Sequence, residues 1–191
     1  MSGGIQAEKE LLRARVGALR RGFDAGWVRE ASARLQAQVM GLPEFLAARQ
    51  VACYLALPGE VQAESIVQRC RTDGKALCLP AFDCAKRVYG FVNWPADAVM
   101  VRGPMGIAQP ADLQAAEGEA IDFVVVPGVA FDTTGGRLGH GGGHFDRMLS
   151  GAVRAFKVGV AFEAQLAERV PMGPHDVRMD AVVTESRVLR G

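Results

Sequence analysis

The stretch LGHGGGHFDRML, residues 138–149, combines four glycines and two histidines with the acid Asp146. Glycines let an anion approach the backbone amides directly, and the start of a helix attracts negative charge. A carboxylate in the first helical turn can hold Mg²⁺ that also bridges phosphate oxygens. The stretch therefore predicts a phosphate-binding turn. Its spacing matches neither standard nucleotide-binding fingerprint, so the pattern by itself identifies no nucleotide.

Two other interpretations of this stretch remain open. Asp146 could simply be an acid near a helix N-terminus, stabilised by the helix dipole. The spacing His144-x-Asp146 also fits a two-histidine, one-carboxylate iron site, with His140 or His175 as the third ligand. Such a site needs side chains that converge on an open metal position, whereas a glycine-rich turn supplies backbone amides. The sequence favours phosphate binding over iron.

The segments on either side of this stretch predict alternating strands and helices. Short apolar runs suggest the strands, and spacings of three and four suggest the helices. The expected strands cover 51–57, 75–80, 121–128, 156–162 and 180–186; the expected helical segments cover 27–39, 63–71, 145–151 and 163–170, with a short helix after Pro43. This alternation predicts a three-layer α/β fold: a mostly parallel sheet with helices on both faces. Residues 82–120 are less regular, with one strand expected over RVYGFVNW.

A first helix is predicted from Glu8 to about Arg21. Its apolar residues recur at spacings of three and four (Leu12, Val16, Leu19, Phe23). Lys9, Arg13 and Arg20 share a narrow stripe beside this apolar face. The stripe could be a solvated charged surface, or it could supply cations to a phosphate site.

Composition limits the class of protein. The chain has 191 residues, of which 49% are hydrophobic and 23% charged, with a net charge of +1. We expect one domain over residues 1–191, because no repeat or linker divides the chain. The balanced charge predicts small-molecule partners and no nucleic acid. We also expect no membrane span, reduced cysteines, a cytoplasmic location and a monomer.

The glycine-rich stretch is the centre of a wider resemblance. PGVAFDTTGGRLGHGGGHFDRML (127–149) resembles the signature of the 5-formyltetrahydrofolate cyclo-ligase family. Four shorter segments resemble that family's motifs in the same order along the chain: KELLR (9–13), YLALPGEVQAESIV (54–67), GIAQP (106–110) and HDVRMDAVVTE (175–185). The resemblance implies an enzyme that closes 5-formyltetrahydrofolate to 5,10-methenyltetrahydrofolate. It implies ATP and Mg²⁺ as cofactors, release of ADP and phosphate, and phosphorylation of the formyl oxygen.

The resemblance also implies roles for individual residues. Lys9 and Arg13 would contact the ATP phosphates, and Arg137 would help to cradle them. The rest of the implied ATP site is one continuous segment: Gly139, His140, Gly141, Gly142, Gly143, His144 and Phe145. Asp146 and Asp180 would bind Mg²⁺. The plainer alternative for Asp180 is an aspartate at a strand entry.

Three further residues would contact the folate. Leu55 and Glu60 match folate-binding positions of the family, and Trp94 would contact the pterin or form a wall. Glu60 could instead be an exposed loop acid, and Trp94 could be an ordinary core residue. No general acid or base is identified.

Some residues depart from the family pattern. His144 replaces a common tyrosine, His140 replaces a tyrosine or basic residue, and Gln109 stands where the family usually has glutamate. These departures leave a second interpretation open. The chain could be a paralogue that binds nucleotide or folate without turnover, or that acts on an altered substrate.

Overall fold

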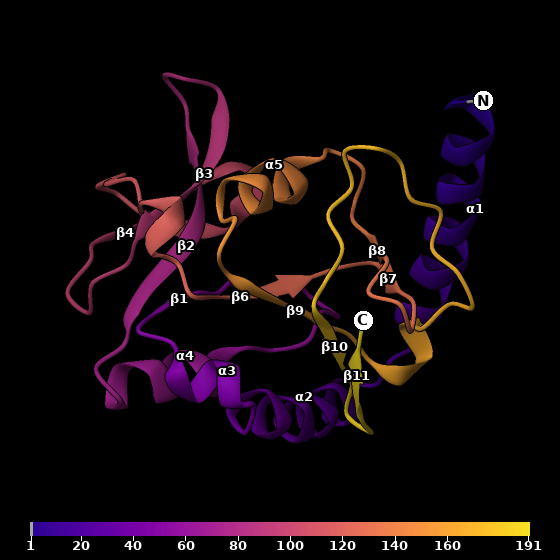
Figure 1. Cartoon of the computed structure of the whole chain (residues 1–191), viewed down its shortest axis with the longest axis horizontal. Coiled ribbons are helices and arrows are strands. Elements are labelled where there is room, and N and C mark those ends of the chain that lie inside the picture. The colour runs from indigo at the N-terminus through magenta and orange to yellow at the C-terminus, as the bar shows by residue number, and fades with distance from the viewer. Residues whose placement is uncertain (1) are drawn as a thin grey trace.

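The computed structural model describes residues 2–191, and its centre is a seven-stranded sheet (Figure 1). The strand order is β11-β10-β9-β6-β1-β2-β3. The strands are β1 (Gln50–Ala52), β2 (Ala76–Asp83), β3 (Val88–Asn93), β6 (Phe123–Pro127), β9 (Phe156–Val160), β10 (Ala181–Val183) and β11 (Val188–Arg190). Neighbouring strands from β2 to β10 run parallel, while β3 and β11 are antiparallel edges. The predicted mostly parallel sheet is confirmed.

Side chains of the central strands alternate between two apolar layers, as the pleat of a strand requires. Val51, Phe123 and Val125 face α2 (Ala25–Met40), α3 (Pro43–Ala47) and α4 (Glu64–Thr72). Ala52 and Val124 face the opposite layer, which includes α5 (His144–Gly151). Figure 1 shows α2, α3 and α4 below the sheet and α5 above it. The predicted α/β architecture with helices on both faces is therefore confirmed.

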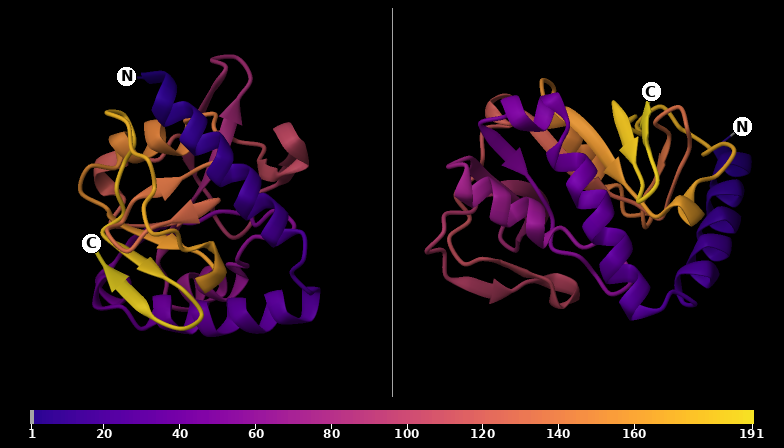
Figure 2. Two further views of the ribbon diagram at one scale, coloured as in Figure 1. Left: turned by 90° about the vertical axis from the view of Figure 1, so that its right-hand side faces the viewer. Right: turned by 90° about the horizontal axis from the view of Figure 1, so that it is seen from below.

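Helix α1 (Ser2–Arg20) lies outside these two helical layers. Its apolar residues Leu12 and Val16 pack on the small hairpin formed by β7 (Ala130–Phe131) and β8 (Arg137–Leu138). Figure 2 shows α1 crossing one side of the molecule, beyond the end of the sheet. The helix begins earlier than the predicted Glu8, and its packing places its charged stripe beside the glycine-rich stretch.

A second hairpin projects from the other side of the sheet. It consists of β4 (Met100–Arg102) and β5 (Ala108–Pro110), joined through the 3₁₀ turn η1 (Pro104–Gly106). This hairpin lies in the region that the sequence describes mostly as loop. A further 3₁₀ turn, η2 (Gly118–Ala120), leads into β6.

Two predicted elements are shorter than expected. The strand expected over 51–57 ends at Ala52, and the Cys53 amide makes the last bond to β2, donating to the Cys78 carbonyl. Farther along, the Leu57 amide donates to the Glu60 carboxylate within a turn. The helix expected over 163–170 is a single 3₁₀ turn, η3 (Glu163–Gln165). Backbone amides that would continue this helix instead donate to the β7–β8 region: Ala167 to Phe131, and Val170 to Asp132.

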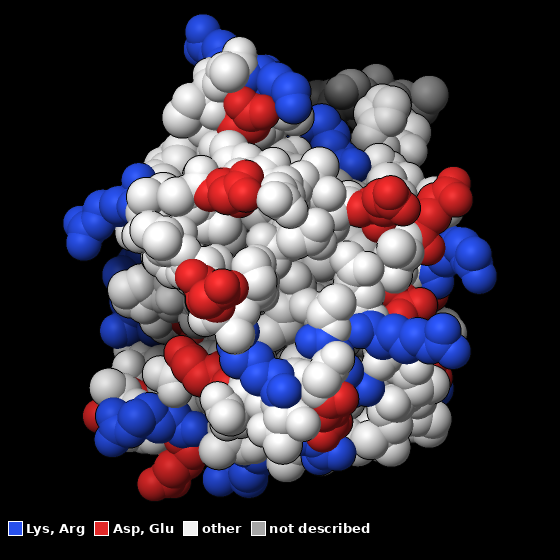
Figure 3. All heavy atoms as spheres, turned by 90° about the vertical axis from the view of Figure 1, so that its left-hand side faces the viewer, with Lys and Arg blue, Asp and Glu red and all other residues white. Residues whose placement is uncertain are grey.

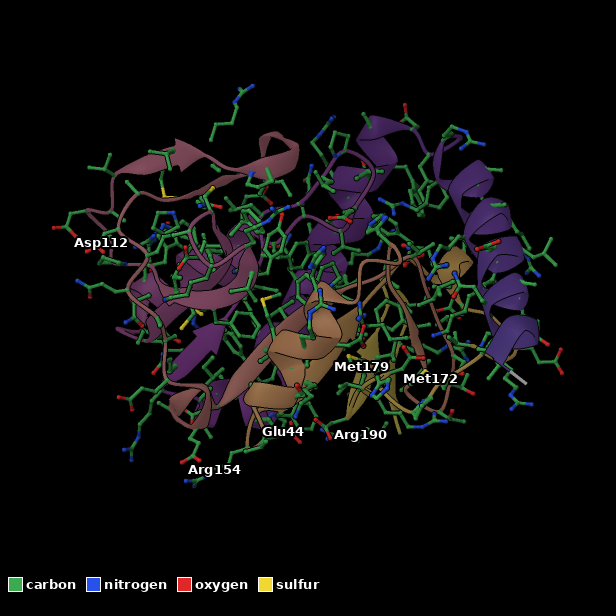
Figure 4. The ribbon with its side chains drawn as sticks, turned by 90° about the horizontal axis from the view of Figure 1, so that it is seen from above. Glu44, Asp112, Arg154, Met172, Met179 and Arg190 are labelled. Atoms are coloured by element: carbon green, nitrogen blue, oxygen red, sulfur yellow. The ribbon has the colours of Figure 1, made fainter. Side chains whose placement is uncertain are left out.

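The surface carries charges of both signs. On the face in Figure 3, Lys and Arg side chains are interspersed with Asp and Glu. Figure 4 labels one ion pair, in which Arg190 of β11 donates to Glu44 of α3 at 2.6 Å. Among residues 2–191, no helix is both long and apolar enough to cross a membrane.

Candidate active site

A pocket lies at the carboxyl end of the parallel strands, where α/β sheets usually bind ligands. Tyr54 and Leu55 follow β1 into its wall, and Pro127 ends β6 there. The start of α5, the side of α1 and the β4–β5 hairpin complete the wall. Segments that are distant in the sequence therefore share one cavity.

The glycine-rich turn forms one side of the pocket, since all residues from Gly139 to Asp146 line it. Gly141 has φ 108° and Gly143 has φ 64°, conformations that residues with a side chain rarely adopt. A Cβ at Gly142 would lie 2.6 Å from the His144 ring. Gly143 is the N-cap of α5, and no side chain caps the helix there. The turn thus lines the pocket with backbone that side chains leave uncovered, next to an uncapped helix N-terminus, and both features suit an anion.

Helix α1 brings two cations to this turn. The Arg13 Nε donates to the Gly139 carbonyl at 2.9 Å, and Lys9 forms an ion pair with Asp176. The Lys9 side chain is only 13% exposed, so a solvated charged surface does not describe it. Both residues line the pocket, so the structure brings these two cations of the stripe and the glycines together, while Arg20 donates to the Gly59 carbonyl and does not line the pocket.

The buried side chain of Arg137 forms an ion pair with the partly buried Asp146 beside the turn. An Arg137 amino group donates to Asp146 Oδ2 at 2.9 Å, and the side chains are 3% and 16% exposed. Asp146 Oδ1 accepts from the Val177 amide. The Arg137 guanidinium also lies 5.6 Å from the centre of the Phe145 ring, and its Nε has no hydrogen-bond partner among the described residues. Asp146 is therefore held in place by a buried cation.

Asp176, and not Asp180, is the second aspartate of this pocket. Asp180 lies at the opposite end of the sheet, immediately before β10, where its carboxylate accepts from the Lys157 amide. The plainer alternative for Asp180, a strand-entry aspartate, agrees with this position. Burial alone would raise the pKa of Asp176, but hydrogen bonds from Gly173 and Lys9 lower it below its ordinary value. Asp176 is therefore an anion facing the pocket.

The predicted folate-contacting residues divide between two places. Leu55 and Glu60 line the pocket, and Glu60 is 7% exposed, so it is not a loose surface acid. The ring of His140 reaches from the glycine-rich turn to Glu60 Oε1 at 3.2 Å. Trp94 does not line the pocket; it packs against the core and lies 4.6 Å from the Arg71 guanidinium. Trp94 is therefore a core-packing residue, the alternative left open by the sequence, and not a wall of the pocket.

His144 contacts an aromatic wall. Its ring lies 4.6 Å from the Tyr89 ring, and its Nδ1 is 2.9 Å from an amino group of Arg147. Burial, and then the Arg147 charge, lower the pKa of His144 below its ordinary value, so the neutral ring is favoured. Among the described residues, no three His, Cys, Asp or Glu side chains are grouped to hold a metal ion. The structure therefore gives no support to the iron-site interpretation.

Comparison with known proteins identifies the family of this chain. The model of the "5-formyltetrahydrofolate cyclo-ligase family" matches residues 5–185. The chain belongs to the 5-formyltetrahydrofolate cyclo-ligase family. Among cyclo-ligases, the Escherichia coli K12 enzyme is 31% identical over 79% of this chain and 86% of its own length. The Saccharomyces cerevisiae enzyme is 29% identical over 93% of this chain and 95% of its own length.

Solved structures agree with this cyclo-ligase assignment. The Aquifex aeolicus 5,10-methenyltetrahydrofolate synthetase superposes with a TM-score of 0.84 at 34% identity, covering 95% of this chain and 92% of the other. A Mycoplasma pneumoniae 5,10-methenyltetrahydrofolate synthetase has a TM-score of 0.73 at 18% identity, covering 93% and 98%, which supports the fold alone. The resemblance drawn from the glycine-rich stretch is confirmed at the level of the family and the fold.

Sequence reasoning missed several residues of this cyclo-ligase pocket. Asp176 stands in the motif HDVRMD, four positions before Asp180, and only the fold shows which of the two acids faces the cavity. Tyr89 and Ile107 come from the irregular middle of the chain, where no periodic pattern indicated a pocket wall. Gln109, which the sequence singles out only as a departure from the family pattern, also lines the pocket.

Proposed function

We propose that this chain catalyses the ATP- and Mg²⁺-dependent closure of 5-formyltetrahydrofolate to 5,10-methenyltetrahydrofolate, with release of ADP and phosphate. Family membership supports the reaction. The main support for an ATP-dependent reaction is the shared pocket. The glycine-rich turn, Lys9 and Arg13 line the same cavity as Leu55 and Glu60. Such a cavity suits a polyphosphate and an organic substrate side by side.

The chemistry explains the need for ATP. A formamide oxygen is a poor leaving group, so N10 cannot expel it directly. In the proposed first step, the formyl oxygen forms a bond to the γ-phosphorus and ADP departs. N10 then attacks the formyl carbon, the carbon–oxygen bond breaks, phosphate departs and N10 loses its proton. The protein mainly positions the reactants and balances their charge.

The residues at the turn fit a triphosphate. Side chains at Gly141 to Gly143 would fill the space beside Arg13, His144 and Arg147, so the glycines keep the backbone accessible. Lys9 and Arg13 supply positive charge at the same place. We propose that Gly139 to Gly143 cradle the phosphates, with His140, His144 and Phe145 completing this segment.

The acids of the pocket fit Mg²⁺. Asp146 and Asp176 both line the cavity, and Mg²⁺ usually takes one or two carboxylates together with substrate phosphates and water. When bound, the ion would neutralise charge on the transferred phosphate. Arg137 orients Asp146 through their partly buried ion pair, and Asp180, at the opposite end of the sheet, would not bind the ion.

The folate side of the pocket centres on Glu60. Its Oε2 accepts from the Leu57 amide, which fixes the carboxylate, while Oε1 lies near His140. A fixed, buried carboxylate suits the donor edge of a pterin. We propose that Leu55 packs on the ring while Glu60 binds this edge.

We further propose that the chain acts as a single-domain monomer in the cytoplasm, on small molecules, without nucleic acid or membrane. The one central seven-stranded sheet supports a single domain, and the net charge of +1 supports small-molecule partners. We expect light scattering at working concentration to give the mass of one chain, and we expect a single cooperative unfolding transition. A stable dimer or two separate transitions would contradict it.

The activity is tested with 5-formyltetrahydrofolate labelled with ¹⁸O in the formyl group. We expect methenyl product only when both Mg²⁺ and ATP are present, with the label recovered in phosphate. Folded protein that binds ATP or folate but forms no product would instead support the non-catalytic paralogue. Product with unlabelled phosphate would contradict phosphorylation of the formyl oxygen.

A further inference from the structure

The side-chain amide of Gln109 pairs with the backbone of strand β2 in the way that the backbone of a paired strand would. Its Oε1 accepts from the Phe82 amide at 3.0 Å, and its Nε2 donates to the Phe82 carbonyl at 3.1 Å. The side chain amide thus satisfies both backbone groups of one residue. A carboxylate at this position could accept the first bond but could not donate the second.

The place of this contact follows from the length of β1. Strand β1 pairs with β2 only over Ala76, Leu77 and Cys78, because β1 ends at Ala52. Farther along, the edge of β2 that faced β1 is not paired with a strand of the central sheet, and the backbone groups there need other partners. Gln109 supplies the partners for Phe82, and it lines the same pocket as Tyr54 and Leu55, which follow β1.

Gln109 is built into the contact and is not a flexible surface residue. It is 8% exposed and lies in β5, opposite Val101 of β4. A Cβ at Gly103 would lie 2.4 Å from Gln109 Oε1, so the glycine allows the hairpin to close over the amide. The pair of bonds therefore fixes the β4–β5 hairpin to the sheet.

The hairpin fixed in this way is a wall of the pocket. Pro104, Ile107 and Ala108 line the cavity beside Leu79 and Pro80 of β2. These are apolar surfaces, which suit a flat heteroaromatic ring and not a phosphate. Figure 4 shows the hairpin across the molecule from α1, which carries the phosphate-side cations, and labels Asp112 just after β5.

We propose that Gln109 is a positioning residue for folate: its amide anchors the β4–β5 hairpin to β2 and so holds the apolar wall against the substrate ring. This inference rests on the proposed function. It also gives Gln109 a role that does not depend on the charge of a glutamate. The residue acts through the hairpin and does not touch the reacting atoms.

The test compares Gln109→Met with Gln109→Glu and with the control Gln68→Met, which changes an exposed glutamine on α4. Methionine keeps the length of the side chain and removes both bonds. We expect the KM for 5-formyltetrahydrofolate to rise about tenfold in Gln109→Met, as for two lost buried hydrogen bonds, with kcat and the KM for ATP within about twofold. Gln109→Glu should raise the folate KM at least as much, because an ionised carboxylate repels the Phe82 carbonyl.

Amide hydrogen exchange gives a second readout. The Phe82 amide should exchange faster in Gln109→Met, while the amides of the central strands β1 and β6 keep their protection. The proposal would be overturned if Gln109→Met left the folate KM unchanged or raised the KM for ATP in its place. It would also be overturned if amides throughout the protein lost their protection from exchange. Absence of turnover in the unaltered protein would instead overturn the proposed function, and the exchange result would still decide whether Gln109 anchors the hairpin.

Discussion

The side chain of Arg137, which is only 3% exposed, donates to the Asp146 carboxylate at 2.9 Å. The pair joins β8 to the first turn of α5, the two elements on either side of the glycine-rich turn. A buried cation with a fixed carboxylate partner sets the position of that carboxylate before any ligand binds. The acid proposed for Mg²⁺ is therefore preorganised by the chain itself.

Asp146→Asn should separate the charge of this residue from its structural role. The new amide can still accept hydrogen bonds, so we expect the free energy of unfolding to fall by about 1–2 kcal/mol. Loss of the carboxylate should lower kcat about a hundredfold or more. Steady-state kinetics over a range of Mg²⁺ concentrations and urea unfolding measure the two effects. The control is Asp180→Asn, away from the pocket, which should keep its Mg²⁺ dependence; equal loss in both variants would contradict the assignment.

Gly141→Ala should weaken ATP binding. Its φ of 108° is strained for alanine, and the new Cβ would lie 3.5 Å from the Arg13 guanidinium carbon. The matched control is Gly74→Ala, which has φ 69° and no atoms within 4 Å of its Cβ. Both substitutions should cost about 1–2 kcal/mol in stability, but only Gly141→Ala should raise the KM for ATP. A KM for ATP that is unchanged in Gly141→Ala would mean that the turn does not hold the phosphates.

Glu60→Gln and His140→Ala should differ in size of effect. Glu60 is 7% exposed and His140 is 62% exposed, so the histidine contact is screened by solvent. We expect Glu60→Gln to raise the folate KM about tenfold or more, and His140→Ala to raise it less than about fivefold. Measured KM values for folate at fixed ATP compare the two. If His140→Ala raised the folate KM more than Glu60→Gln, the proposal that the Glu60 carboxylate is the main contact with the pterin edge would be wrong.

Asp132 should contribute stability that depends on pH. Its buried carboxylate accepts from the amides of Thr134, Gly136 and Val170. Burial alone would raise the pKa of Asp132, but these bonds lower it below the ordinary value of 3.8. A lowered folded-state pKa gives stability that is present above pH 3.8 and is lost as pH falls toward the folded value.

Asp132→Asn is therefore expected to destabilise the protein by about 1–3 kcal/mol at neutral pH, and by less at pH 3. Urea unfolding of both proteins at the two pH values measures this difference. A difference that grows as the pH falls would contradict the sign of the shift.

The sequence predicts well the features that local patterns encode. The apolar runs at 121–128 and 156–162 correspond to β6 and β9, and the glycines before His144 mark the start of α5. The charged stripe of Lys9 and Arg13 reaches the predicted place because Leu12 and Val16, on the same helix, pack beside β7 and β8.

Features that depend on distant partners could not be predicted in this way. No local signal shows that Val170 donates to Asp132 in place of continuing a helix. The choice between Asp176 and Asp180 depends on which end of the sheet each one reaches. The contact between Gln109 and Phe82 depends on an edge of β2 that is left unpaired because β1 is short, and no local pattern shows this.

The central claim is that the glycine-rich turn, with Lys9 and Arg13, holds the triphosphate of ATP. A crystal structure of the protein with Mg²⁺ and a non-hydrolysable ATP analogue tests it most directly. We expect the β- and γ-phosphates against the amides of Gly139 to Gly143, with the metal ion at Asp146. Phosphates bound elsewhere, or a turn that stays closed to them by its own Arg13 contact, would contradict the account.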